Sequence, residues 1–337
     1  MEDNNIVLEV NHLKTSFFYG KKEGKAVDDV SFKVKRGEIL GIVGESGSGK
    51  SVTAMSIMSL LRNTTGKVMG GDVIFMNQNL LALSDKEMRA IRGKHISMVF
   101  QEPMTSLNPV LTVGEQIEET IIQHEKVSKK EAWARAKELL DVVQIPLSEK
   151  RLKEYPHQLS GGMRQRVMIA MGLCCNPDLI IADERTTALD VTIQMQILEL
   201  FKSLRDKYNM SIILITHDMG VIAEMADNVM VMYAGCMVEY GDTVSVLKNP
   251  KHPYTKALMD AIPKLDEKQE TLNAIPGVLP GLMNLPEGCR FNPRCKYAAD
   301  KCRHERPEEY VKEGRTVYCW KVLEEEKEGL LWKNYLK

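Results

Sequence analysis

The residues best suited to chemistry form a glycine-rich loop, GESGSGKS, at residues 44–51. The loop fits the pattern G-x-x-x-x-G-K-[ST], in which glycines let backbone N–H groups turn inward around the phosphates of a nucleotide. Lys50 supplies a positive charge, and Ser51 can ligate Mg²⁺. The predicted contacts to the phosphates and the metal are Gly44, Glu45, Ser46, Gly47, Ser48, Gly49, Lys50, Ser51 and Val52.

Two acids follow the apolar run LIIA at residues 179–182. Asp183 is placed to hold Mg²⁺ through water, and Glu184 to polarise the attacking water as a general base. Paired acids after a strand more often cap the next helix. The phosphate loop upstream nevertheless favours the catalytic interpretation, so the two segments together predict hydrolysis of a nucleoside triphosphate.

A second glycine-containing loop, LSGGM at residues 159–163, precedes another amphipathic stretch. Ser160, Gly161 and Gly162 therefore predict a second anion site at a helix N-terminus. If the two loops lie on separate lobes, this one cannot reach the phosphates held by its own chain. Such a loop needs a partner subunit.

Short apolar runs that alternate with long amphipathic stretches must position these loops. The predicted buried strands are 39–44, 178–184, 210–218 and 228–235, and the predicted helices are 51–61, 129–143 and 194–208. This alternation predicts an α/β fold with a mostly parallel sheet. The first forty residues alternate apolar and polar types around a polar turn, which indicates a small antiparallel sheet. Residues 103–158 look mainly helical.

The composition restricts the kinds of partner. The 45 Lys and Arg residues are nearly cancelled by 46 Asp and Glu, so a net charge of −1 provides no basic field for nucleic acid. The chain starts without a secretory signal pattern, and its longest apolar run is Val167 to Cys175. That run is far shorter than the ~18 apolar residues of a membrane helix. We therefore expect a cytosolic chain whose clustered cysteines bind a metal rather than form disulfides.

Six ordered motifs resemble those of the nucleotide-binding subunit of an ATP-binding cassette (ABC) transporter, over residues 1 to about 245. GESGSGKS is similar to the Walker A loop of this P-loop NTPase family, and LIIADE to its Walker B strand. LSGGM resembles the signature, with Met163 where glutamine is commoner, and ALD at 188–190 resembles the D-loop, with Asp190 contributing to the nucleotide site. The resemblance implies that two such subunits close head to tail over two ATP molecules.

Three further residues take their expected roles from this resemblance. Gln101 in VFQEP resembles the Q-loop residue that senses Mg²⁺ and couples to membrane subunits. His217 in ITHD resembles the switch histidine on the γ-phosphate. The aromatic residue that stacks under adenine should be Phe17, with Phe18 or Tyr19 as alternatives.

One position departs from the family pattern. The family usually has proline after the Walker B glutamate, whereas this chain has Arg185. Loss of proline should loosen the backbone around Glu184, and the arginine could pair with that carboxylate and lower its basicity. We therefore expect slower hydrolysis than in a proline version, unless Arg185 simply points to solvent.

A composition change near residues 248–253 predicts a domain boundary, with a nucleotide-binding domain at 1–248 and an extension at 249–337. The helical subdomain that carries the signature is expected at about 103–170. The extension begins with HPYT and contains CRFNPRC, which resemble the C-terminal extension of dipeptide and oligopeptide permease ATPases. The cargo implied by this resemblance is short peptides.

Four cysteines gather in the extension, namely Cys289, Cys295, Cys302 and Cys319. Four thiolates suit either tetrahedral Zn²⁺ or a [4Fe–4S] cluster, and the spacing fits neither common pattern closely. The wide intervals suit a bulky cluster slightly better, and the resemblance to peptide permease ATPases implies iron–sulfur. We expect a structural staple, and we expect Cys174, Cys175 and Cys236 to be packed residues.

The resemblance implies two membrane permease subunits as partners, a second related ATPase or a second copy, and indirectly an extracytoplasmic peptide-binding protein. The chain would then lie peripherally at the cytoplasmic face of the cell membrane, with no nucleic-acid partner. A soluble ABC ATPase acting on ribosomes or DNA is the competing class, but it normally has two cassettes or a coiled-coil insertion, and neither is evident here. A P-loop kinase would leave the signature and switch motifs unexplained.

Overall fold

The computed structural model describes residues 5–62, 64–100, 106–183, 191–262 and 275–327. The chain forms two compact units. The first comprises Met1–Leu8, Val34–Ile39 and Phe75–Ile215, and the second comprises Glu9–Lys33, Leu40–Ile74 and Thr216–Lys337. No helix within these described ranges is long and apolar enough to cross a membrane.

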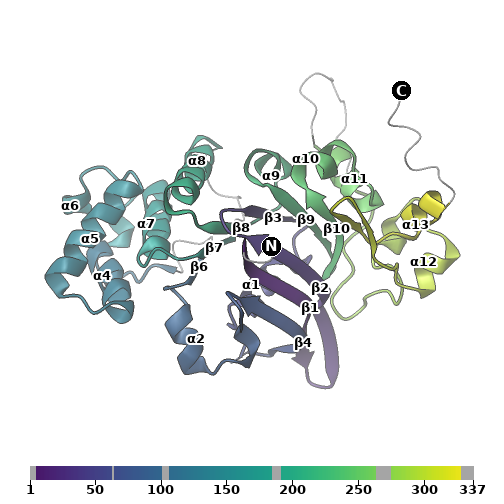
Figure 1. Cartoon of the computed structure of the whole chain (residues 1–337), viewed down its shortest axis with the longest axis horizontal. Coiled ribbons are helices and arrows are strands. Elements are labelled where there is room, and N and C mark those ends of the chain that lie inside the picture. Colours follow the sequence, from purple (N-terminus) through teal and green to yellow (C-terminus); the bar gives the residue numbers. More distant parts are fainter. Residues whose placement is uncertain (1–4, 63, 101–105, 184–190, 263–274, 328–337) are drawn as a thin grey trace. The chain divides into compact units, whose positions relative to one another are not determined.

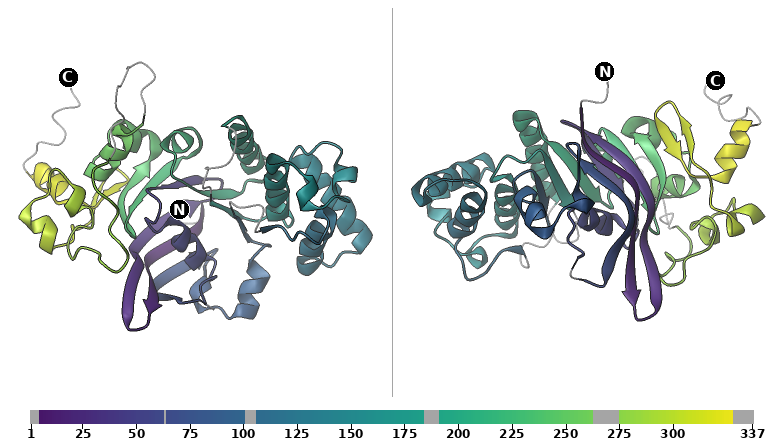
Figure 2. Two further views of the ribbon diagram at one scale, coloured as in Figure 1. Left: turned by 180° about the vertical axis from the view of Figure 1, so that it is seen from behind. Right: turned by 60° about the horizontal axis from the view of Figure 1, so that its bottom comes forward.

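A sheet of long strands opens the second unit. Strands β1 (Ile6–Tyr19) and β2 (Lys22–Lys35) are joined by a short turn at Gly20, where φ is 62°, and β4 (Gly66–Phe75) lies on the other side of β1. A tight turn between neighbouring strands makes them antiparallel, and Figure 2 shows this long hairpin in two views. The predicted antiparallel sheet near the N-terminus is therefore confirmed, although its turn is shorter than the polar stretch suggested.

The second unit also holds a mixed sheet with the strand order β11-β12-β10-β9-β3. Strand β3 (Ile39–Val43) runs parallel to β9 (Asn228–Tyr233), and β9 pairs antiparallel with β10 (Cys236–Asp242). The short strands β11 (Tyr310–Lys312) and β12 (Arg315–Val317) form a hairpin that adds to the edge of β10. All of β3 is buried, as the sequence predicted for this apolar run.

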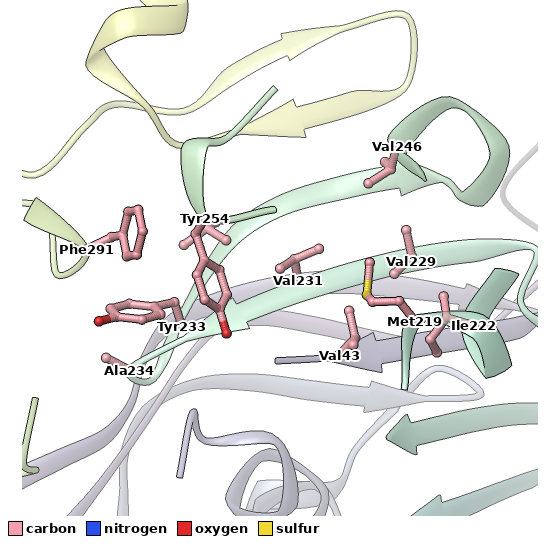
Figure 3. Packing of buried hydrophobic residues seen from close by; sticks show 11 residues of the cluster. Val43, Met219, Ile222, Val229, Val231, Tyr233, Ala234, Val246, Tyr254 and Phe291 are labelled. Atoms are coloured by element: carbon pink, nitrogen blue, oxygen red, sulfur yellow. The ribbon is translucent and has the colours of Figure 1, made fainter. Parts of the chain in front are cut away.

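Short helices and a buried core complete the second unit. The helices are α1 (Lys50–Ile57), α9 (Met219–Met225), α10 (Thr243–Lys248), α11 (Pro253–Asp260), η4 (Asn292–Arg294), α12 (Asp300–His304) and α13 (Trp320–Lys327). Helix α1 ends earlier than the predicted stretch 51–61. Figure 3 shows the core, in which Val43, Val231 and Met219 share one cluster with Tyr254 and Phe291. The tail beyond residue 249 thus contributes aromatic side chains to this core.

The first unit contains three parallel strands in the order β8-β7-β6. They are β6 (Ile96–Val99), β7 (Leu179–Asp183) and β8 (Ser211–Thr216), with Ile181 paired to Met98 and to Ile213. Nearly all side chains of β7 and β8 are buried, which is why their sequences read as continuous apolar runs. The predicted parallel strands are therefore confirmed.

Helices make up most of the rest of the first unit (Figure 1). The elements are β5 (Gln78–Asn79), η2 (Leu80–Ala82), α2 (Asp85–Ile91), α4 (Val113–His124), α5 (Lys129–Val142), α6 (Ser148–Arg151), η3 (Pro156–Gln158), α7 (Gly161–Leu173) and α8 (Val191–Tyr208). Helices α4 and α5 both begin with a capping box, formed by Thr112 with Glu115 and by Ser128 with Glu131. The mainly helical character expected for residues 103–158 is confirmed from residue 106 onward.

Candidate nucleotide site and cysteine cluster

The phosphate loop lies between the end of β3 and the start of α1, within the second unit. Gly49 caps α1 with φ of 104°, and a Cβ there would lie 2.6 Å from the carbonyl oxygen of Ala26. Gly47 also has a positive φ, of 82°. Only glycine adopts such backbone angles without strain, so this sequence can turn tightly enough to direct N–H groups inward.

Lys50 folds its side chain into the loop and is buried. Its Nζ donates to the carbonyl oxygens of Gly44 at 2.6 Å and Glu45 at 2.9 Å, and to Ser48 Oγ at 3.3 Å. The ammonium group therefore lies within the loop at residues 44–51, which the sequence predicts to bind phosphate. Positive charge and inward N–H groups together favour a polyanionic ligand.

Sequence reasoning missed two partners of Glu45 in this loop. The backbone N–H of Glu45 donates to Tyr254 Oη at 2.9 Å. Arg294 Nη1 donates to both carboxylate oxygens of Glu45, at 2.9 and 3.0 Å. Tyr254 belongs to the HPYT motif and Arg294 to CRFNPRC. Neither motif indicates by its sequence which residues it contacts.

Phe17 and His217, two other predicted site residues of the second unit, lie on different elements. The Phe17 ring packs on strand β4, because a Cβ at Gly66 would come within 2.9 Å of the ring. His217 is exposed directly after β8, and Asp218 caps α9 by accepting from the N–H of Gly220 at 2.7 Å. The residue that caps α9 is therefore Asp218 and not His217.

The first unit carries two further parts of the predicted site. Asp183 ends β7 with a partly buried side chain, and its Oδ1 is buried without a hydrogen-bond partner among the described residues. An orphaned carboxylate oxygen is a fitting ligand for Mg²⁺ or a metal-bound water. The structure therefore offers the acceptor that a metal at this strand end requires.

The signature loop begins helix α7. Ser160 is the N-cap, and its Oγ accepts from the N–H of Met163 at 3.3 Å. A Cβ built on Gly161 would meet nothing within 4 Å, whereas Gly162 is buried. The N-terminus of a helix of 13 residues is thus open to a ligand at Gly161. Gln101, Glu184, Arg185 and Asp190 lie outside the described residues.

The four tail cysteines line one cavity, together with His252, Phe291 and Trp320. All are free thiols. Burial and the neighbouring cysteines raise the pKa of Cys289 to about 12, and burial likewise raises the pKa of Cys319 to about 11. A bound metal ion would lower the pKa of these thiols, because its ligands are thiolates.

The four thiols share a cavity without forming a ready ligand set. Within the part of the chain that the structure describes, no group of three or more His, Cys, Asp or Glu side chains is arranged so that it could hold a metal ion. The predicted cysteine-bound metal therefore has the right donor chemistry, four buried or half-buried thiols, but no assembled coordination geometry. Of the cysteines expected to be packed, Cys174 is buried, and Cys175 and Cys236 are half-buried.

Comparison with known families matches two regions of the chain. The description "ABC transporter" matches residues 27–187, and "Oligopeptide/dipeptide transporter, C-terminal region" matches residues 238–302. The chain is 54% identical over 320 residues to the oligopeptide transport ATP-binding protein AppD of Bacillus subtilis, covering 95% of this chain and 98% of AppD. It is 51% identical to the dipeptide transport ATP-binding protein DppD of the same species, covering 93% and 94%.

Solved structures show the same fold. The dimeric ATP-binding cassette MJ0796, in a post-hydrolysis state bound to ADP and Pi, superposes with a TM-score of 0.63 at 31% identity. The match covers 70% of this chain and 98% of that cassette. AppD and DppD, which are 54% and 51% identical over nearly the whole chain, share a family with it as well as a fold. The chain therefore belongs to the ABC transporter ATP-binding proteins, in the branch that carries the oligopeptide/dipeptide transporter C-terminal region.

Proposed function

We propose that this chain binds and hydrolyses ATP to power the import of dipeptides or oligopeptides through an ABC transporter. The observation that carries the proposal is the phosphate loop, in which glycine geometry and the buried Lys50 ammonium form an anion site at the start of α1. The relative AppD is an oligopeptide transport ATP-binding protein, and the relative DppD is a dipeptide transport ATP-binding protein. Their similarity over nearly the full chain supports the same cargo class here.

The proposed mechanism assigns one task to each motif. Backbone N–H groups of residues 44–52, other than the N–H that Glu45 donates to Tyr254, hold the phosphates together with Lys50, and Ser51, Asp183 and Gln101 would hold Mg²⁺. Bound Mg²⁺ neutralises charge on the phosphates. Glu184 takes a proton from the attacking water, whose oxygen bonds to the γ-phosphorus as the bond to ADP breaks. Phe17 stacks on adenine, and His217 contacts the γ-phosphate.

The proposed assembly needs a second ATPase subunit. Ser160, Gly161 and Gly162 would face the nucleotide of that subunit, since a helix N-terminus favours phosphate, and Asp190 would lie at the same contact. We infer two membrane permease subunits as further partners, a peptide-binding protein outside the membrane, and a position at the cytoplasmic face. The proposed domains are 1–248, with a helical part at about 103–170, and 249–337.

The test compares binding with hydrolysis. Glu184→Gln removes the proposed base and keeps the size of the side chain, so hydrolysis should fall by about a hundredfold or more while MgATP still binds. Membranes holding the permease subunits and the wild-type chain should import peptide only when ATP is present. Full hydrolysis by the Glu184→Gln protein, or peptide uptake that does not depend on this chain, would contradict the proposal.

We also infer that the four tail cysteines hold a [4Fe–4S] cluster, with Zn²⁺ as the alternative metal. The support is the donor set, because Cys289, Cys295, Cys302 and Cys319 line one cavity as free thiols. Such a metal would act as a structural staple for the tail. Protein purified without oxygen should contain about four iron and four sulfide per chain, and Cys302→Ser should lose them.

The control for that measurement is Cys175→Ser, a cysteine that does not line the cavity. It should keep the full metal content. One zinc per chain without iron would establish the alternative metal. A chain with neither metal would mean that the four cysteines are ordinary thiols.

A further inference from the structure

Glu45 places a carboxylate in a loop that is built to bind phosphates. Its side chain is 29% exposed, so it is neither fully solvated nor fully covered. A negative charge beside a polyanionic ligand opposes binding, and the opposition grows where water is partly excluded. A chain that binds ATP at this loop therefore has to neutralise Glu45 or hold it away from the phosphates.

Arg294 meets this requirement. Its Nη1 bridges both carboxylate oxygens of Glu45 at 2.9 and 3.0 Å, and its side chain is only 4% exposed. The rest of the guanidinium is fixed by carbonyl oxygens, since Nε donates to Pro276 at 2.8 Å and Nη2 to Ile275 at 3.2 Å. An arginine held on several sides loses little further freedom when it pairs with a carboxylate.

Tyr254 fixes the main chain of the same residue. Its hydroxyl accepts the Glu45 N–H, and its ring packs against those of Tyr233 and Phe291, with centroids 4.7 and 5.3 Å away. Figure 3 shows the three rings beside the end of β9. Burial, together with the nearby Glu45 carboxylate, raises the pKa of Tyr254, so the hydroxyl stays neutral. Glu45 is thus held through both its backbone and its side chain.

The turn that carries Arg294 is itself anchored. Arg294 ends the short helix η4, which lies between Cys289 and Cys295. Arg290, one residue after Cys289, donates from Nη2 to the buried carboxylate of Asp28 at 2.6 Å. The Arg290–Asp28 pair therefore fixes the segment of the tail from which Arg294 contacts the phosphate loop.

We propose that Arg294 is a positioning residue for ATP binding, which neutralises Glu45 and holds its carboxylate against the tail, while Tyr254 fixes the Glu45 backbone. This proposal rests on the proposed ATP site at residues 44–51. It gives the C-terminal extension a task at the nucleotide site, because the affinity of the phosphate loop for MgATP then depends on a residue 249 positions away in the sequence.

The experiment measures the dissociation constant of MgATP for the full-length protein by displacement of a fluorescent ATP analogue. Arg294→Gln leaves an unpaired carboxylate in the loop, so binding should weaken about tenfold. Glu45→Gln removes that charge and is the background in which Arg294→Gln is tested again. In that background Arg294→Gln should change the dissociation constant by less than about threefold. This rescue is the result that a purely structural role of Arg294 would not give.

Two more variants complete the experiment. Arg303→Gln is the matched control, an exposed arginine of the same tail, and should bind like wild type. Tyr254→Phe keeps the ring packing and loses only the hydroxyl that accepts the Glu45 N–H, so it should weaken binding about threefold while the protein still folds. It carries the test if Arg294→Gln does not fold.

The outcomes separate this inference from the proposed function. Wild-type affinity in both Arg294→Gln and Tyr254→Phe would overturn the inference. A double variant about tenfold weaker than Glu45→Gln would also overturn it, because the charge of Glu45 would then not be the cause. Failure of the wild-type protein to bind MgATP at all would instead contradict the proposed function.

Discussion

At the scale of single residues, Lys50 combines burial with a positive charge. Its ammonium group donates to three oxygens of its own loop, at 2.6 to 3.3 Å. Phosphate oxygens would compensate that charge better than neutral carbonyl groups do. We predict that Lys50→Ala weakens MgATP binding by at least about tenfold, measured by nucleotide displacement. Lys86→Ala, at an exposed position of α2, is the control and should not change affinity.

A second residue-scale prediction concerns Arg185, which replaces the usual proline after Glu184. Proline restricts the backbone of the residue before it, and a nearby arginine lowers the basicity of a carboxylate. We predict that Arg185→Pro raises the turnover number for ATP several-fold and leaves the MgATP dissociation constant unchanged. Steady-state hydrolysis and equilibrium binding measure the two quantities separately. Equal turnover in both proteins would mean that Arg185 does not affect Glu184.

Local motifs could be predicted at this scale because their chemistry is contained in a few consecutive residues. Residues 44–51 needed only their spacing and the strand before them to indicate a phosphate loop. The pair Glu45 and Arg294 could not be predicted in this way, because 249 positions separate the two residues. Neither residue type is unusual in its own segment, and only the folded tail brings them together.

At the scale of elements, the tail hairpin β11–β12 was not predicted. Each strand has three residues, too few to show an alternating pattern. The buried strands β3 and β8, by contrast, were evident as continuous apolar runs because both faces are covered. The hairpin is held instead by pairing with β10, through Glu239 opposite Val317 and Tyr240 opposite Thr316.

Glu239 shows how this hairpin is fastened. Its carboxylate is fully buried and accepts from the backbone N–H of Lys251 at 2.9 Å and from Arg315 Nε at 3.0 Å. We predict that Arg315→Ala lowers the free energy of unfolding by about 3 kcal/mol, because it leaves a buried carboxylate without its charged partner. Urea denaturation measures the change.

The control for the Glu239 pair is Arg303→Ala, an exposed arginine of the same tail, which should change the free energy of unfolding by less than about 0.5 kcal/mol. A loss of similar size in both variants would mean that the buried pair is not what fastens the hairpin. ATP binding should persist in Arg315→Ala, since Arg315 contacts residues of β10 and α10 rather than the phosphate loop.

At the scale of the whole molecule, one buried acid joins the beginning of the second unit to its end. Asp28 of β2 is 6% exposed and pairs with Arg290 at 2.6 Å and with Arg306. Burial alone would raise the pKa of Asp28, but the hydrogen bond from Arg306 and the charges of both arginines outweigh it and lower that pKa below 3.8. The charged form of Asp28 is therefore the one that the fold stabilises.

This shift determines a pH dependence of stability. A carboxylate with a lowered pKa in the folded state binds protons more weakly there than in the unfolded chain, so its contribution is fully present above about pH 4 and is lost as the pH falls through the folded-state pKa. We predict that the free energy of unfolding of wild type, measured in urea, falls more between about pH 5 and pH 3 than that of Asp28→Asn. Asp29→Asn, which changes a neighbouring, more exposed carboxylate, should retain the wild-type slope. Equal slopes for wild type and Asp28→Asn would mean that the two arginines do not fasten the tail through the charge of Asp28.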